Sequence, residues 1–217
     1  RVYHQWDQMS ETERQLHRRD IADLHVQTAR RFEHAAVFFH PPGGWRSDED
    51  TFRTLDYIRE LSGMDYYLTM HGDCTYGLPR GDTMMDFVAR LADEPQEVKD
   101  EADRRVDGAL ARAERFAAHG ALDGFTLCSD YCFNDNPFLS PAMFDEFVTP
   151  YLARVIAGYR DLGFYVVKHT DGNIMPILDS LVSAGPHALH SLDPQGGVDI
   201  AEVKRRVGDK VCLIGNV

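Results

Sequence analysis

The chain has 217 residues, of which 43% are hydrophobic and 27% charged, and its formal net charge is −12. Such a surface repels nucleic acid and anionic membranes, and the basic residues are scattered through helical stretches instead of forming a patch. No apolar run approaches the ~20 residues needed to span a bilayer, so we expect neither nucleic-acid nor membrane partners.

The four cysteines do not form a regular framework. Cys74, Cys128, Cys132 and Cys212 include no CxxC pair. This pattern favours a reducing, cytoplasmic compartment, and we interpret Cys128 and Cys132 as buried structural thiols. The first residue is Arg1 and not an initiator Met, so we expect the sequence to start inside a longer protein. The first residues show no signal-peptide pattern.

Short apolar runs alternate with longer helical patterns along the chain. Ser10 and Glu13 have the spacing of a capping box, Ser140 and Pro141 open a later helix, and Pro150 should kink or split that helix. The other predicted helices cover residues 10–34, 47–61, 83–91, 95–119, 174–184 and 199–207. The predicted strands cover residues 35–40, 66–71, 124–128, 165–169, 188–192 and 211–216.

This order of strands and helices predicts an α/β fold with a parallel sheet and helical crossovers. An open doubly wound sheet and a closed barrel both fit the pattern. An eight-unit barrel typically needs ~250 residues, so a barrel would lack about two of its βα units here. No linker is recognisable, and we expect residues 1–217 to form a single domain.

Groups that bind metals or transfer protons follow the predicted strands. They are His40, His71 with Asp73, Asp130, His169 with Asp171, Asp193, and Asn216. Because the carboxyl ends of parallel strands share one edge or rim, these groups should collect where such folds place their sites.

The sharpest local pattern is the segment 168–173, KHTDGN. Side chains at positions i and i+2 of a strand point the same way, so His169 and Asp171 can converge on one ion or one substrate. An imidazole nitrogen and a carboxylate oxygen are both competent zinc ligands. The alternative is a simple Asp171-Gly172 turn beside an interior histidine.

Two weaker patterns lie nearby. His71 and Asp73 repeat the i, i+2 spacing, although His71 could be an ordinary loop histidine. Asp130 and Tyr131 could supply a carboxylate and a phenol to a substrate or a proton relay. Asp130 could equally cap the turn that follows it.

Several motifs in the stretch 121–217 occur in an order that resembles one known superfamily. They are the acidic turn 129–131, the segments 138–144 and 147–151, the run 169–173, the triplet 192–194, and the final segments 199–204 and 213–217. They resemble the uroporphyrinogen decarboxylase and corrinoid methyltransferase superfamily, whereas residues 1–120 match only in general layout. The resemblance implies a (β/α)8 TIM barrel, incomplete here with about six βα units.

The resemblance implies one of two chemistries. One branch decarboxylates uroporphyrinogen without a metal, and the other uses zinc to move a methyl group between a corrinoid and a thiol or another acceptor. In the zinc branch the motif usually reads His-x-Cys-Gly, with His and Cys as zinc ligands. This chain has His169 but Asp171 at the Cys position. The arginine-rich N-terminal signature of true decarboxylases is not recognisable.

Our leading hypothesis is therefore a methyltransferase-like enzyme in which Asp130, Tyr131, His169 and Asp171 are catalytic. His169 and Asp171 would bind Zn²⁺, and a corrinoid (cobalamin) would be co-substrate, carried on a corrinoid protein or free. The expected substrate-binding residues are His71, Asp73, Asn173, Asp193 and Asn216. The alternatives are a cofactor-free uroporphyrinogen decarboxylase and a non-catalytic corrinoid- or tetrapyrrole-binding protein. Whether the chain forms a homodimer stays open.

Overall fold

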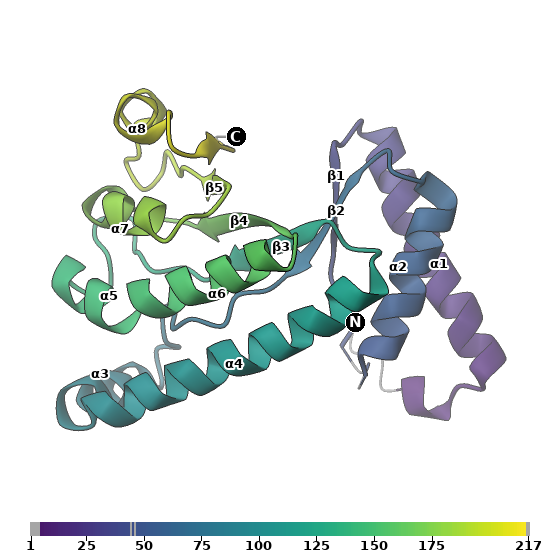
Figure 1. Ribbon diagram of the computed structural model, residues 1–217, viewed down its shortest axis with the longest axis horizontal. Helices are drawn as coiled ribbons and strands as arrows, with labels where there is room; N and C mark the ends of the chain where they lie inside the picture. Colours follow the sequence, from purple (N-terminus) through teal and green to yellow (C-terminus); the bar gives the residue numbers. More distant parts are fainter. Residues whose placement is uncertain (1–4, 44, 46, 216–217) are drawn as a thin grey trace. The chain divides into compact units, whose positions relative to one another are not determined.

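The computed structural model describes residues 5–43, 45 and 47–215. Its strands belong to one six-stranded sheet in the order β1-β2-β3-β4-β5-β6, and the pairs β1–β2, β4–β5 and β5–β6 are parallel (Figure 1). The strands are β1 (Ala36–Phe39), β2 (Tyr67–His71), β3 (Gly124–Cys128), β4 (Tyr165–Thr170), β5 (Ala188–Ser191) and β6 (Cys212–Leu213). A sheet with strands in chain order, alternating with helices, confirms the predicted α/β class and corresponds to an incomplete (β/α)8 barrel.

The helices connect successive strands. They are α1 (Glu11–Arg31), α2 (Asp48–Ser62), α3 (Met84–Asp93), α4 (Pro95–His119), α5 (Pro141–Phe147), α6 (Thr149–Asp161), α7 (Leu178–Ser183) and α8 (Ile200–Val207), with short 3₁₀ turns η1 (Trp6–Gln8) and η2 (Met175–Ile177). Among the described residues, we find no helix with the length and apolar composition that crossing a bilayer requires.

Some element boundaries differ from the sequence prediction. Helix α1 begins with the expected capping box at Ser10, but it ends at Arg31 because Glu33 adopts a left-handed φ of 53°. The helix predicted from Ser140 is split at Val148, as Pro150 required, since proline offers no amide to a continuing helix. The predicted strand 211–216 is only Cys212–Leu213, and Asn216 lies outside the described residues.

The chain divides into two compact units. The first comprises residues 1–71 and 115–124, and the second comprises residues 72–114 and 125–217. In the first unit, α1 and α2 lie side by side (Figure 1). Its core includes buried Ala22 and Val26 from α1 and Leu55 and Ile58 from α2.

Arg59 of α2 organises polar contacts in the first unit. Its guanidinium donates to Asp123 Oδ2 at 2.6 Å and to the carbonyl oxygens of Ala121 at 2.8 Å and Tyr66 at 3.1 Å. The same Asp123 oxygen accepts the backbone amide of Leu68 at 2.7 Å. The pair therefore ties α2 to the segments that lead into β2 and β3.

In the second unit, β4 alternates between buried and accessible side chains. Val166, Lys168 and Thr170 are buried, whereas His169 on the opposite side of the strand is half-buried. This period of two is a property of any strand, and it places His169 on the accessible side only because Lys168 is accepted in the core.

The buried ammonium of Lys168 is fully engaged. It donates to Asp73 Oδ2 at 2.8 Å, to Ser129 O at 3.0 Å and to Leu127 O at 3.1 Å. It also lies 4.2 Å from the centre of the Tyr131 ring. Buried charges are tolerated when they are paired and hydrogen-bonded in this way.

The partner carboxylate stays ionised in spite of its burial. Burial alone would raise the pKa of Asp73, but the Lys168 ammonium and hydrogen bonds from Thr75 outweigh it and hold that pKa below its ordinary value. The pair thus connects the loop after β2 with β3 and β4 beneath the accessible face of β4.

We predict that Asp123→Ala lowers the free energy of unfolding by about 2–3 kcal/mol, because it removes the carboxylate that pairs with the Arg59 guanidinium and accepts the Leu68 amide. Urea denaturation followed by circular dichroism measures this change. Asp56→Ala is the matched control, since Asp56 is 56% exposed in its pair with His119 and should cost no more than about 1 kcal/mol. Equal effects of the two substitutions would contradict the role given to Asp123.

We predict that Lys168→Met costs about 3–5 kcal/mol, because it leaves the Asp73 carboxylate buried without a counter-charge. Since the pKa of Asp73 is depressed in the folded state, its contribution is present above the ordinary carboxyl pKa and is lost as the pH falls through the folded value. In Lys168→Met the Asp73 carboxylate should therefore become protonated at a higher pH than in the parent chain. The pH dependence of the urea midpoint measures this; unchanged profiles would contradict it.

Candidate functional site

Three side chains at the ends of two strands meet in the second unit. Asp130 follows β3, and His169 and Asp171 come from the end of β4. His169 Nε2 lies 3.9 Å from Asp130 Oδ1 and 3.7 Å from Asp171 Oδ2. One nitrogen and two carboxylate oxygens lie within 4.8 Å of one another. The i, i+2 spacing on β4 and the neighbouring loop after β3 together produce this arrangement.

These ligand atoms are accessible. The side chains of Asp130 and Asp171 are 49% and 53% exposed, and that of His169 is 22% exposed. A cation bound between them would keep coordination positions open to small molecules, which is the property that separates catalytic from structural metal sites.

Strand β5 supports both ligands from β4. In the parallel register His169 pairs with His190 and Thr170 with Ser191. The Nδ1 atoms of His169 and His190 are 2.7 Å apart, and Ser191 Oγ donates to Asp171 Oδ1. Strand β5 therefore contacts His169 through Nδ1 and Asp171 through Oδ1, and it leaves His169 Nε2 and Asp171 Oδ2 facing each other.

Backbone amides fix the carboxylate positions further. The amide of Asp171 donates to Asp130 Oδ1 at 3.1 Å. The turn after it needs glycine, because Gly172 has a φ of 79° and a Cβ there would lie 2.6 Å from the carbonyl oxygen of Phe133. A Cβ at Gly196 would lie 2.4 Å from the carbonyl carbon of Gly172, so the loops after β3, β4 and β5 pack together only with glycine at these positions.

Two ionisable groups beside the cluster are held in their neutral forms. Burial, and then the neighbouring His169, lower the pKa of His190, so its imidazole is neutral at physiological pH. Burial raises the pKa of the Cys128 thiol to about 11, so this residue remains a thiol. The donor set at the mouth of the strands is thus one imidazole and two carboxylates.

This set fits a divalent cation. Zinc accepts imidazole nitrogen and carboxylate oxygen as ligands. A carboxylate at position 171 in place of a thiolate makes the donor set harder, so the set also suits Mn²⁺ or Mg²⁺. Asp130 would be the third ligand of such an ion. The sequence alone did not assign it to a metal, because Asp130 follows β3 whereas His169 and Asp171 lie at the end of β4.

The structure gives Asp73 and Tyr131 a setting different from the one expected. Both carboxylate oxygens of Asp73 are engaged by Lys168 and Thr75, and its side chain is 1% exposed. The Tyr131 hydroxyl is buried and lies 2.6 Å from Thr75 Oγ1. Burial, and then Asp73, raise the pKa of Tyr131 well above its ordinary value. Both side chains are thus buried and hydrogen-bonded in the core, whereas the sequence prediction places Asp73 against a substrate and makes Tyr131 catalytic; those roles stay predictions.

Two further predicted substrate-binding residues, Asp193 and Asn173, make hydrogen bonds to loop backbone. Asp193 accepts the amides of Gly172 at 3.2 Å and Gln195 at 2.8 Å. The Asn173 side chain donates to Asp135 O at 2.8 Å. Both residues hold loops around the cluster, and substrate contact stays a prediction for them. It also stays a prediction for His71, which is exposed at the end of β2 in the first unit.

Sequence reasoning missed the supporting residues of the site. Lys168, His190 and Ser191 were not singled out, although a lysine inside an apolar strand signals a buried partner. His190 and Ser191 could have been found from the parallel register, which places the fifth predicted strand beside the fourth. That register depends on pairing across strands and not on any local motif.

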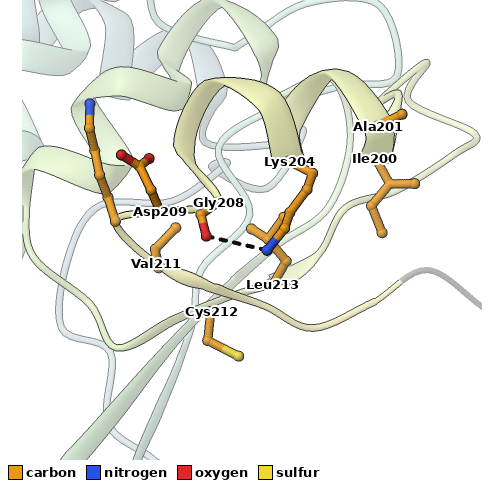
Figure 2. Close-up of a pocket in the computed structure, with 9 residues that line it drawn as sticks. Ile200, Ala201, Lys204, Gly208, Asp209, Val211, Cys212 and Leu213 are labelled. Carbon is orange, nitrogen blue, oxygen red and sulfur yellow. Dashed lines mark hydrogen bonds between the residues drawn. The ribbon is translucent and has the colours of Figure 1, made fainter.

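A separate pocket of 710 Å³ lies between α8, the turn that follows it and β6 (Figure 2). One of its two lysines, Lys204, donates to the carbonyl oxygen of Gly208 at 3.3 Å. Cys212 is exposed on β6. None of the predicted site residues within the described part of the chain lines this pocket.

Comparison with known proteins agrees with this fold. A solved structure described as a methyltransferase from Methanosarcina mazei superposes with a TM-score of 0.72 at 16% sequence identity, over 91% of this chain and 68% of that chain. At this identity the likeness shows the fold alone. A search of curated protein sequences returned no match. A family model described as uroporphyrinogen decarboxylase (URO-D) matches residues 79–217, well over half of the chain. The chain therefore belongs to the uroporphyrinogen decarboxylase family.

Proposed function

We propose that this protein is a methyltransferase-like member of its family that binds a divalent metal ion through Asp130, His169 and Asp171. The observation that carries the proposal is the meeting of these three ligand atoms within 4.8 Å at the ends of β3 and β4. The resemblance described above assigns no metal to the decarboxylase branch, so a metal-competent cluster favours the methyltransferase branch.

Each residue of the cluster would supply one ligand atom to the ion. His169 would offer Nε2 to the ion, and Asp130 and Asp171 would offer one oxygen each. The bound ion would act as a Lewis acid on the methyl donor or acceptor. The exposed sides of both carboxylates leave room for that substrate, and the locked loops after β3, β4 and β5 would keep the ligands in place without a metal.

The carboxylate at position 171 bears on the choice of acceptor. A thiolate-rich zinc site is suited to activating thiols, whereas an Asp–Asp–His set is harder and less thiophilic. We infer that an oxygen or nitrogen group is the better acceptor for this chain. A corrinoid as methyl carrier, free or on a corrinoid protein, and a cytoplasmic location belong to the proposal as well.

Tetrapyrrole decarboxylation is the second candidate. Asp130 supports it, because an accessible carboxylate half-exposed at the strand ends could accept the N–H groups of a pyrrole. In that case the cluster would work without an ion, and His169 and Asp171 would act as substrate contacts. A binding protein without catalysis would show ligand affinity and no turnover.

We predict that the chain binds one Co²⁺ or Zn²⁺ and that His169→Ala abolishes this binding. Asp130→Asn and Asp171→Asn should each weaken it at least tenfold, because each removes an anionic ligand. Isothermal titration calorimetry measures the affinities, and the visible bands of Co²⁺ report the ligand set.

The matched control is Asp209→Asn, an exposed aspartate from the pocket of Figure 2. It should bind the ion as the parent chain does. Binding that survives His169→Ala, or that falls with Asp209→Asn, would contradict the assignment of the ion to the cluster.

We predict that metal-loaded protein demethylates methylcobalamin in the presence of an oxygen or nitrogen nucleophile, and that removal of the ion by a chelator stops the reaction. The change in the cobalamin absorption spectrum follows the transfer. Turnover of uroporphyrinogen by metal-free protein, with no effect on methylcobalamin, would instead establish the decarboxylase function.

A further inference from the structure

We propose that His190 is the positioning residue that holds the His169 ring with Nε2 turned toward Asp130 and Asp171. This inference deepens the proposed function and rests on it for its consequence in metal binding. The two rings are cross-strand neighbours in the β4–β5 register, with their centres 4.9 Å apart. Neither the family match nor the KHTDGN motif assigns a role to position 190.

The geometry leaves His169 one orientation. Its Nδ1 lies 2.7 Å from His190 Nδ1, and its Nε2 lies 3.7 Å from Asp171 and 3.9 Å from Asp130. Rotating the ring by half a turn would break the short contact and withdraw Nε2 from both carboxylates. The hydrogen bond between the two imidazoles is therefore what aims the ligand nitrogen.

The hydrogen bond also determines where the protons reside when an ion is present. A metal needs the lone pair of His169 Nε2, so the proton of that ring must be on Nδ1. His190 Nδ1 accepts this proton in a hydrogen bond, and its own proton is then on Nε2. Outer partners of this kind fix the tautomer and orientation of ligating histidines.

Ser191 repeats the arrangement one residue later. Its hydroxyl donates to Asp171 Oδ1, while the other oxygen of Asp171 faces His169. Two consecutive residues of β5 thus support the two ligands of β4. This correspondence indicates that β5 forms an outer layer of the site and is not simply the next strand of the sheet.

The test compares His190→Leu with His190→Asn. Leucine removes the acceptor, whereas the Oδ1 of asparagine takes the place of Nδ1 and can still accept the proton. We expect His190→Leu to weaken Cd²⁺ and Zn²⁺ binding 10–100-fold and His190→Asn to stay within about threefold of the parent chain. Calorimetry gives the affinities, and ¹¹³Cd–¹⁵N couplings in histidine-labelled protein show whether His169 Nε2 is the ligand.

A second readout requires no metal. In ¹⁵N-histidine-labelled apo protein, the proton between the two Nδ1 atoms should give a protected imidazole N–H signal in the parent chain and in His190→Asn. It should be absent in His190→Leu. His187→Leu is the matched control, because His187 accepts the amide of Val166 at 3.0 Å before β5 and should affect stability without changing metal affinity.

The outcomes separate this inference from the proposed function. Metal affinity equal in His190→Leu and the parent chain, or a Cd²⁺ coupling to His169 Nδ1, overturns the positioning role while metal binding stands. A parent chain that binds no ion but shows the protected imidazole proton, lost only in His190→Leu, overturns the proposed metal function and leaves the ring-positioning role intact.

Discussion

The alternation of side chains along β4 is the constraint on which the site depends. Residues of a strand face opposite sides in turn, so placing His169 on the accessible side commits Lys168 to the core. A buried ammonium is acceptable only with a counter-charge and hydrogen bonds, and Asp73, Leu127 and Ser129 supply them. The metal-competent face of β4 and the ion pair behind it are thus two consequences of one register.

The ion pair also shows that polar groups after β2 and β3 lie in different surroundings. Asp73 and Tyr131 follow strands and carry reactive groups, yet both complete the environment of Lys168. Asp130, next to Tyr131 in the sequence, faces the other way and joins His169. Neighbouring residues at a strand end therefore divide between supporting the core and presenting ligands, as the pleat requires.

Local features of the fold and the candidate site could be predicted from the sequence, whereas features that depend on which strands are neighbours could not. The strand at 124–128 and the helix split before Pro150 were predicted because apolar runs and proline act locally. The convergence of His169 and Asp171 was predicted because it depends only on the i, i+2 spacing. The approach of Asp130 to His169, the contact of His190 with His169 and the burial of Asp73 depend on which strands are neighbours, and no local pattern contains that information.

Anomalous X-ray scattering from crystals grown with Zn²⁺ or Mn²⁺ shows directly whether an ion binds among Asp130, His169 and Asp171. We expect an anomalous peak within bonding distance of His169 Nε2 and of one oxygen from each aspartate. A protein crystallised with the ion in excess and showing no peak there, or showing its peak at other residues, would contradict it.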